Sequence, residues 1–296
     1  MEPVTVHAEI AEPSRLQLGE GSFWDAATGR LYWIGIEDRR VMWLEPATGE
    51  VTSLELDTMP GTLVPYRDRR VLLATQRGFE LLDTATGALR PVAEVEADRT
   101  HRRMNDGKCD PYGRLLAGTM TLDEPREPGP LYRLEPTDGG TVRAVPVLDG
   151  LAIPNGLAWP EPDRLWYIDT PTRRIDLYAY PEHGPVGPLI RTIDTAQLPG
   201  DPDGMTLDAE GNLWVAFWGG SAVRCFGPDG TLLETVELPV PQVTSVAFGG
   251  PDLRTLYITS AATGTDPGDG LPHGALFRCE GVATGRPGVP WAGPGA

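Results

Sequence analysis

Short apolar runs recur along this chain at a nearly constant interval, and turn-forming residues flank each run. Alternation of apolar and polar positions, with almost no helical periodicity, predicts β-strands. The strand cores begin at positions 31, 71, 115, 165, 213 and 256, so neighbouring cores are 40, 44, 50, 48 and 43 residues apart. Such intervals are typical of propeller blades. The pattern predicts an all-β fold, a six-bladed β-propeller with four-stranded blades.

Glycine and proline punctuate these repeats. The 36 glycines and 30 prolines stand between the strand-like runs, and a 40% hydrophobic composition with 8 tryptophans can supply a core. A closed all-β architecture of 296 residues commonly forms one domain, so we expect a single propeller domain over residues 1–296. The Gly- and Pro-rich stretch 281–296 is expected to be a poorly ordered tail.

The N-terminal segment 4–10 has no repeat of its own, although its sequence, VTVHAEI, alternates as a strand does. Closing a propeller requires the two ends of the chain to share a blade. We therefore expect this segment to pair as the outer strand of the last blade, beside residues 275–278.

Acidic residues outnumber basic ones by 42 to 25, which gives a net charge of −17. Such a surface repels polyanions, so we expect no nucleic acid and no membrane as partner. The N-terminus lacks a basic region and an apolar signal segment, and the three cysteines, Cys109, Cys225 and Cys279, form no Cys-x-x-Cys pair. These features predict a cytoplasmic, reduced protein whose cysteines are buried apolar side chains.

Four oxygen-bearing side chains share one phase of the repeat. Glu20, Asn105, Asn155 and Asp203 stand ten or eleven residues ahead of a strand core. An Asn-Gly or Asp-Gly pair is more often an ordinary hairpin turn, but a shared phase favours convergence on the propeller axis. Carboxylate and amide oxygens suit Ca²⁺, Mg²⁺ or Mn²⁺, while Zn²⁺ and Fe²⁺ are not signalled by any histidine spacing.

Arg103 lies two residues before Asn105, in the run RMNDGK. An arginine beside an acidic metal site can hold a spare carboxylate or a substrate oxygen through two N–H groups, and a plain surface charge is the alternative. The chain has neither a Gly-x-Ser-x-Gly nucleophile elbow nor a phosphate-binding P-loop. Serine-nucleophile chemistry and phosphoryl transfer therefore have no support in the sequence.

At these residues the chain resembles the senescence marker protein/gluconolactonase/regucalcin family, nearly from end to end. The resemblance implies a six-bladed propeller with one divalent metal in its central channel. It also implies hydrolysis of a sugar (aldono) lactone to the aldonic acid, as in the bacterial sugar lactonases. The motifs that carry it, in order, are residues 19–24, 103–108, 118–120, 154–157, 202–205 with 208–211, and 248–250.

The resemblance further implies the roles of individual residues. Glu20, Asn155 and Asp203 are expected to ligate the metal. The metal is expected to be Ca²⁺, Mg²⁺, Mn²⁺, Zn²⁺ or Fe²⁺. Asp203 is also expected to act as the catalytic acid and base. Arg103 and Asn105 are expected to hold the hydroxyl and ring oxygens of the substrate.

One position departs from the animal branch of the family, in which a Glu shortly after Gly-Thr-Met touches the sugar. Here the matching position is Asp123, with Glu124 beside it, in the irregular insert 120–130. Either residue is a candidate substrate contact. The stretch AFWGG, which contains Trp218, looks more like the bacterial sugar lactonases.

Two rival functions are left open by the sequence. The same propeller could hydrolyse other esters or organophosphates, or it could bind calcium without catalysis, because a fold alone does not fix a function. A hydrolase needs metal positions open to water and substrate, whereas a binding protein can seal them. The expected partner is a small-molecule sugar lactone, and the chain is expected to be a monomer or weak homo-oligomer.

Overall fold

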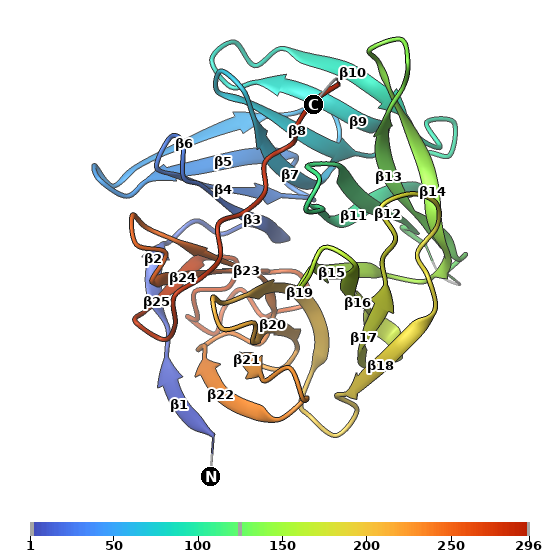
Figure 1. Ribbon diagram of the computed structural model, residues 1–296. Helices are drawn as coiled ribbons and strands as arrows, with labels where there is room; N and C mark the ends of the chain where they lie inside the picture. The colour runs from blue at the N-terminus through green and yellow to red at the C-terminus, as the bar shows by residue number, and fades with distance from the viewer. Residues whose placement is uncertain (1–2, 124–125, 295–296) are drawn as a thin grey trace.

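Six β-sheets arranged as a ring make up the molecule (Figure 1). The computed structural model describes residues 3–123 and 126–294. The first three blades are β3 (Gly19–Asp25), β4 (Arg30–Gly35), β5 (Arg40–Glu45) and β6 (Glu50–Glu55); β7 (Pro60–Tyr66), β8 (Arg70–Thr75), β9 (Gly78–Asp83) and β10 (Leu89–Glu94); and β11 (Arg102–Cys109), β12 (Leu115–Thr121), β13 (Gly129–Pro136) and β14 (Val142–Leu151).

The other three blades follow the same plan. They are β15 (Pro154–Ala158), β16 (Arg164–Asp169), β17 (Arg174–Ala179) and β18 (Leu189–Asp194); β19 (Asp201–Leu207), β20 (Leu213–Trp218), β21 (Ala222–Phe226) and β22 (Leu232–Glu237); and β23 (Val243–Gly249), β24 (Thr255–Ser260) and β25 (Leu276–Glu280). A short 3-10 helix, η1 (Thr170–Thr172), follows β16. The first strands of the blades contact one another around the ring, so they line the axis. The predicted six-bladed propeller is confirmed.

The N-terminal segment closes the ring in a different way from the one expected. It forms two strands, β1 (Val4–His7) and β2 (Glu9–Glu12). Only β2 pairs with β25 of the last blade, whereas β1 pairs in parallel with β22 and adds a fifth strand to the fifth blade. The expectation of one continuous outer strand over 4–10 is thus wrong for its first half. Alternation predicts a strand but does not say which exposed sheet edge the strand will find.

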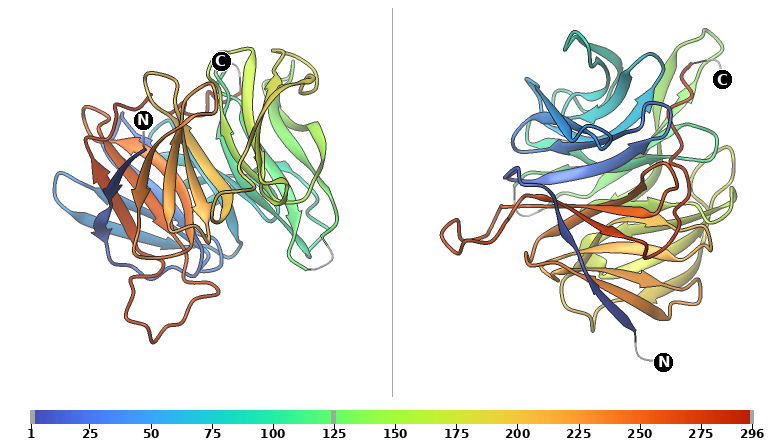
Figure 2. Two further views of the ribbon diagram at one scale, coloured as in Figure 1. Left: turned by 90° about the horizontal axis from the view of Figure 1, so that it is seen from below. Right: turned by 90° about the vertical axis from the view of Figure 1, so that its left-hand side faces the viewer.

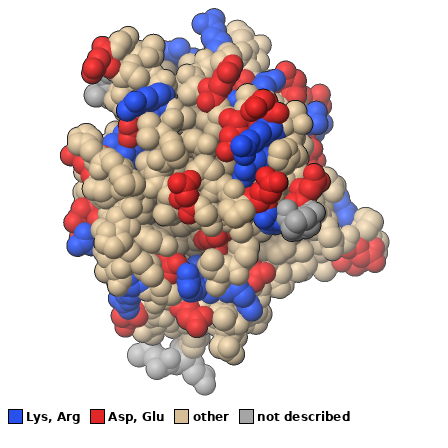
Figure 3. All heavy atoms as spheres, turned by 90° about the vertical axis from the view of Figure 1, so that its right-hand side faces the viewer, with Lys and Arg blue, Asp and Glu red and all other residues tan. Residues whose placement is uncertain are grey.

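Apolar side chains fill the spaces between neighbouring blades. One cluster joins residues of the first three blades, and Trp33 and Trp214 are among the largest side chains that are fully buried. All three cysteines are free and buried, as predicted. Among the described residues no helix has the length and apolarity needed to cross a membrane. Acidic and basic side chains are interspersed on the face drawn in Figure 3.

The C-terminal segment lies across one face of the propeller instead of forming the poorly ordered tail expected from its composition. Its backbone is tied to three blades, through Ala209 N–H to Thr284 O at 2.8 Å, Trp291 N–H to Pro65 O at 3.0 Å, and Ala292 N–H to Gly113 O at 3.0 Å. Trp291 is only 6% exposed. Hydrogen bonds to blade edges and one buried aromatic side chain hold this Gly- and Pro-rich segment without regular structure, which corrects the expectation for residues 281–294 (Figure 1).

Candidate functional site

Every first strand is irregular at the same place. The pairing of each first strand with its neighbour shifts register, and a bulge of this kind redirects side chains. Because all six shifts lie at one level of the ring, the residues beside them face one another across the axis. The shifts fall between Glu20 and Phe23, Pro60 and Thr62, Met104 and Gly107, Pro154 and Leu157, Pro202 and Met205, and Val243 and Val246.

The pairs Asn155-Gly156 and Asp203-Gly204 lie inside strands β15 and β19 and do not form hairpin turns. A Cβ atom on Gly156 would lie 2.7 Å from the carbonyl oxygen of Asp203, and one on Gly204 would lie 2.9 Å from that of Thr244. Real Cβ atoms do not approach backbone so closely, so glycine is needed where the first strands crowd the axis. The alternative of ordinary tight turns is therefore excluded for these two motifs.

Two buried carboxyl groups, Glu20 and Asp203, lie at this level with exposures of 6% and 5%, close enough to act on each other electrostatically. Burial, and then the charge of Asp106, raises the pKa of Glu20 from 4.5 to about 8. Burial, followed by the charges of Glu20 and Asp106, raises the pKa of Asp203 well above its usual value. The protein alone thus holds these carboxylates without enough positive charge to compensate them.

Asn155 completes the cluster and is oriented by its neighbours. Its Nδ2 donates to Thr170 Oγ1 at 2.8 Å, and Thr170 Oγ1 donates to the carbonyl oxygen of Pro202 at 2.9 Å. These bonds fix which end of the amide is free. Asn155 Oδ1 and Asp203 Oδ1 are both buried and have no hydrogen-bond partner in the described parts of the chain.

These oxygens fit a hard divalent cation. A buried oxygen without a hydrogen-bond partner raises the free energy of the folded state. A cation would coordinate the amide oxygen and reduce the electrostatic repulsion between the two carboxylates. The described residues contain no group of three or more His, Cys, Asp or Glu side chains that fits a metal ion. The candidate set instead combines the Glu20 and Asp203 carboxylates with the amide oxygen of Asn155.

Asn105 lies at the same level but is already engaged. Its Nδ2 donates to Pro154 O at 2.8 Å, and its Oδ1 accepts a hydrogen bond from Arg103 Nη1 at 2.5 Å. Arg103 Nη1 also donates to Met104 O at 3.0 Å. Burial lowers the pKa of Arg103 to about 10, against the opposing effect of Glu20. The pair forms a rigid polar wall beside the carboxylates, distinct from the three oxygens that fit a cation.

Asp123 does not lie in this buried cluster. Its side chain is exposed at the end of β12, and its carbonyl oxygen accepts a hydrogen bond from Thr121 Oγ1 at 3.3 Å. Its neighbour Glu124 falls outside the described residues. Trp218 is half-buried at the end of β20. It pairs with Asp201, which lies two residues before Asp203 in β19.

Three charged residues near the cluster were not singled out from the sequence. Asp106 acts on both carboxyl groups, and Glu37 and Arg126 act electrostatically on Arg103. Asp106 lies within the RMNDGK run and could have been found there. Glu37 follows the first strand core, and its carboxylate accepts a hydrogen bond from Thr263 at 2.9 Å, so the projecting loop 261–273 reaches this side of the ring (Figure 2).

The metal-free protein should become less stable as the pH rises. The folded-state pKa of Glu20, about 8, lies above its ordinary 4.5. The folded state therefore binds more protons than the unfolded state in this window, and stability is lost between the two values. We expect the melting temperature in EDTA to fall from pH 5 to pH 8, and a divalent cation to raise it more at pH 8. Glu20→Gln should flatten the dependence, and a wild-type curve that rises over this window would contradict the assignment.

Comparison with known proteins gives one consistent family. A family model described as the SMP-30/gluconolactonase/LRE-like region matches residues 18–262. The chain is 39% identical over 281 residues to a pentonolactonase of Haloferax volcanii, covering 92% of this chain and 93% of the relative. It is 35% identical over 292 residues to a putative sugar lactone lactonase of Bacillus subtilis, covering 97% and 99%. The crystal structure of a calcium-binding protein, regucalcin, from Agrobacterium tumefaciens superposes with a TM-score of 0.90 at 31% identity, covering 98% and 99%.

Proposed function

Because the chain belongs to the SMP-30/gluconolactonase/LRE-like family, we propose that it is a carboxylic ester hydrolase that opens a sugar lactone to the aldonic acid. The observation that carries the proposal is the buried cluster of Glu20, Asn155 and Asp203, in which two oxygens have no hydrogen-bond partner among residues 3–123 and 126–294. The lactonase names of the two sequence relatives support the same reaction. Glu20, Asn155 and Asp203 would hold one divalent cation.

Asp203 is the proposed proton carrier. A lactone is an ester, and its hydrolysis needs a base for the attacking water and an acid for the leaving ring oxygen. Asp203 would accept a proton from that water and return it to the ring oxygen as the C–O bond breaks. The bound cation would supply Lewis acidity toward the developing oxyanion.

Arg103 and Asn105 would orient the sugar. Only Nη1 of Arg103 is engaged, and its Nε and Nη2 make no hydrogen bond within the described parts of the chain. These donors suit hydroxyl and ring oxygens, and the hydrogen bond to Asn105 fixes the plane of the guanidinium. Because the two side chains are already held in place, they would position the lactone carbonyl relative to Asp203 without a further loss of conformational entropy during the reaction.

The experiment is an activity panel. Gluconolactone, xylonolactone, arabinolactone and galactonolactone are tested with Ca²⁺, Mg²⁺, Mn²⁺, Zn²⁺ and Fe²⁺, and spontaneous hydrolysis is subtracted. We expect at least one lactone to be hydrolysed in a metal-dependent way, and faster than an aryl ester or an organophosphate. Preference for the aryl ester or the organophosphate would favour the rival hydrolase. Cation binding with no turnover of any ester would favour a calcium-binding protein.

We predict that the insert 120–130 sets the ranking among lactones. Asp123→Ala should change relative kcat/KM values between sugars by several-fold, because Asp123 is exposed at the end of a strand whose partner strand carries Arg103. Metal affinity should stay the same, since Asp123 lies outside the buried cluster. The measurement is kcat/KM for each lactone beside calorimetry with the cation. An unaltered ranking would move the specificity determinant to Trp218.

A further inference from the structure

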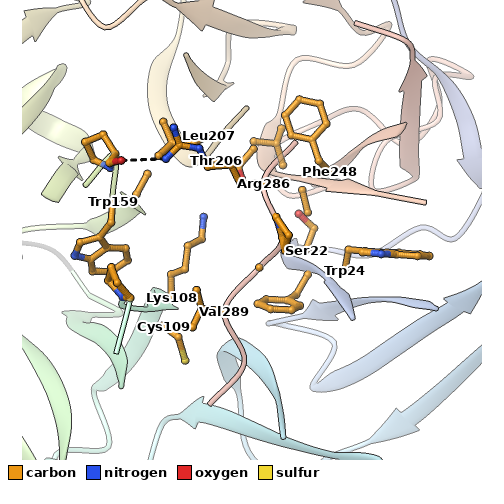
Figure 4. Close-up of a pocket in the computed structure, with 18 of the residues that line it drawn as sticks. Ser22, Trp24, Lys108, Cys109, Trp159, Thr206, Leu207, Phe248, Arg286 and Val289 are labelled. Carbon is orange, nitrogen blue, oxygen red and sulfur yellow. Dashed lines mark hydrogen bonds between the residues drawn. The ribbon is translucent and has the colours of Figure 1, made fainter. Parts of the chain in front are cut away.

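A cavity lies toward the opposite end of the channel from the carboxylate cluster, and Figure 4 shows residues that line it. It encloses about 330 Å³, at the lower end of the range for ligand pockets. Glu20, Asn155 and Asp203 lie near the beginnings of β3, β15 and β19, whereas the cavity is lined by residues at the ends of the first strands. Those residues are Trp24, Cys109, Ala158, Leu207 and Phe248.

The C-terminal segment forms one wall of this cavity. Residues 286–289 line it, and the segment is fixed there by two hydrogen bonds of Arg286. The backbone N–H of Arg286 donates to Leu207 O at 3.4 Å, and its Nη1 donates to Pro160 O at 3.0 Å, which is the dashed line in Figure 4. The cavity is thus a product of the segment that docks across this face, and the guanidinium places a positive charge at its edge.

Most of the remaining lining is apolar or aromatic, and the charged side chains are Lys108, Arg286 and Glu161. Lys108 reaches across the channel, and its Nζ donates to Met205 O. Its other two N–H groups have no hydrogen-bond partner among the described residues. Lys108 also lines a small neighbouring cavity together with Asp106, so its side chain lies between the two cavities.

We propose that this cavity binds a small molecule with a flat apolar body and a single carboxylate. The apolar body would pack between Trp159 and Phe248, and the carboxylate would accept the free N–H groups of Lys108. A sugar would find too few polar partners here, and a phosphate dianion would pay a larger desolvation cost than one ammonium offsets. Lys108 and Arg286 outnumber Glu161 in the lining, so within a chain of net charge −17 this cavity favours an anion.

The test uses 2-naphthoate as the probe and 2-naphthamide as its neutral counterpart. Calorimetry on the metal-loaded protein should show saturable binding of one naphthoate per chain, with naphthamide at least 10-fold weaker. Lys108→Met should weaken naphthoate binding at least 10-fold. Arg103→Met, which removes a cation at the other end of the channel, is the matched control and should leave naphthoate affinity within 2-fold. Excess gluconate should not displace the probe.

A second variant is needed to distinguish loss of the binding site from misfolding, because Lys108→Met leaves the buried Asp106 without its counter-charge. Val289→Trp adds bulk from the half-buried C-terminal segment into the cavity and should abolish naphthoate binding. Loss of binding in a Val289→Trp protein that melts normally supports the proposal. Absence of binding to the wild type, displacement by gluconate, or weakening by Arg103→Met alone would overturn it.

Discussion

Replacing Asp203 by Asn should lower kcat for lactone hydrolysis by roughly 10²-fold or more at saturating metal. The amide keeps the size of the side chain and one ligating oxygen, but it cannot accept a proton from water. Asp203 combines a carboxylate, an Oδ1 without a hydrogen-bond partner among the described residues, and an electrostatic interaction with Glu20. The cation should therefore still bind, more weakly, while the proton transfer is lost.

Two measurements separate this outcome from simple loss of the metal. Metal analysis of the Asp203→Asn protein establishes occupancy under the assay conditions. A pH profile then reports the missing base, because hydroxide can replace it and the residual rate should rise steadily with pH. If the metal-loaded variant hydrolyses every lactone at the parental rate, the base lies elsewhere and Glu20 is the next carboxylate to examine.

The repeat pattern predicted the blades because every blade contains one core strand with a similar apolar run. This strand lies between two neighbouring strands of the same sheet. It did not predict that β1 pairs with β22, since an exposed edge offers its backbone groups to any strand. Nor did composition predict the docking of 281–294, which depends on a buried Trp291 and on hydrogen bonds to three blades. Long-range pairings of this kind leave no local periodicity in the sequence.

The shared phase predicted the buried cluster, and the structure explains its one irregularity. Glu20 stands eleven residues ahead of its strand core where Asn155 and Asp203 stand ten. In the strand pairing Glu20 occupies the position just before the register shift, which in those other blades is occupied by Pro154 and Pro202. A glutamate side chain is one methylene longer than that of aspartate and reaches the same level from there. Gly21, with a φ of 59°, takes the bulge position itself.

The sequence could not separate the roles of the four phase-matched residues, because spacing says nothing about hydrogen bonds. In the structure both ends of the Asn105 amide are hydrogen-bonded, to Arg103 and to Pro154, whereas Asn155 Oδ1 has no partner within the described ranges. The same limit applies to Glu37, in the turn between β4 and β5, and to Arg126, in the insert after β12, which both act on Arg103. Residues in such segments have no phase from which their position could be predicted.

This difference between the two asparagines gives the second large prediction. Asn155→Ala removes a buried oxygen that has no partner among the residues that the structure describes, and Glu20→Ala removes one of the two buried carboxylates. Each should weaken binding of the divalent cation by more than 10-fold, about 1.4 kcal/mol or more. Each should also lose activity at limiting metal and recover part of it at high metal. Calorimetry and metal titrations of kcat provide the measurements.

Asn105→Ala is the matched control, because it removes the same amide from the same level of the ring. Its oxygen is occupied by Arg103, so cation affinity should change by less than 3-fold while KM for the lactone rises. Unchanged cation affinity in both Glu20→Ala and Asn155→Ala would falsify the metal assignment. An equal loss in all three variants would mean that general disruption of the crowded axis, rather than ligation, governs binding. A loss confined to Glu20 and Asn155 identifies the unpartnered oxygens as the ones that hold the metal.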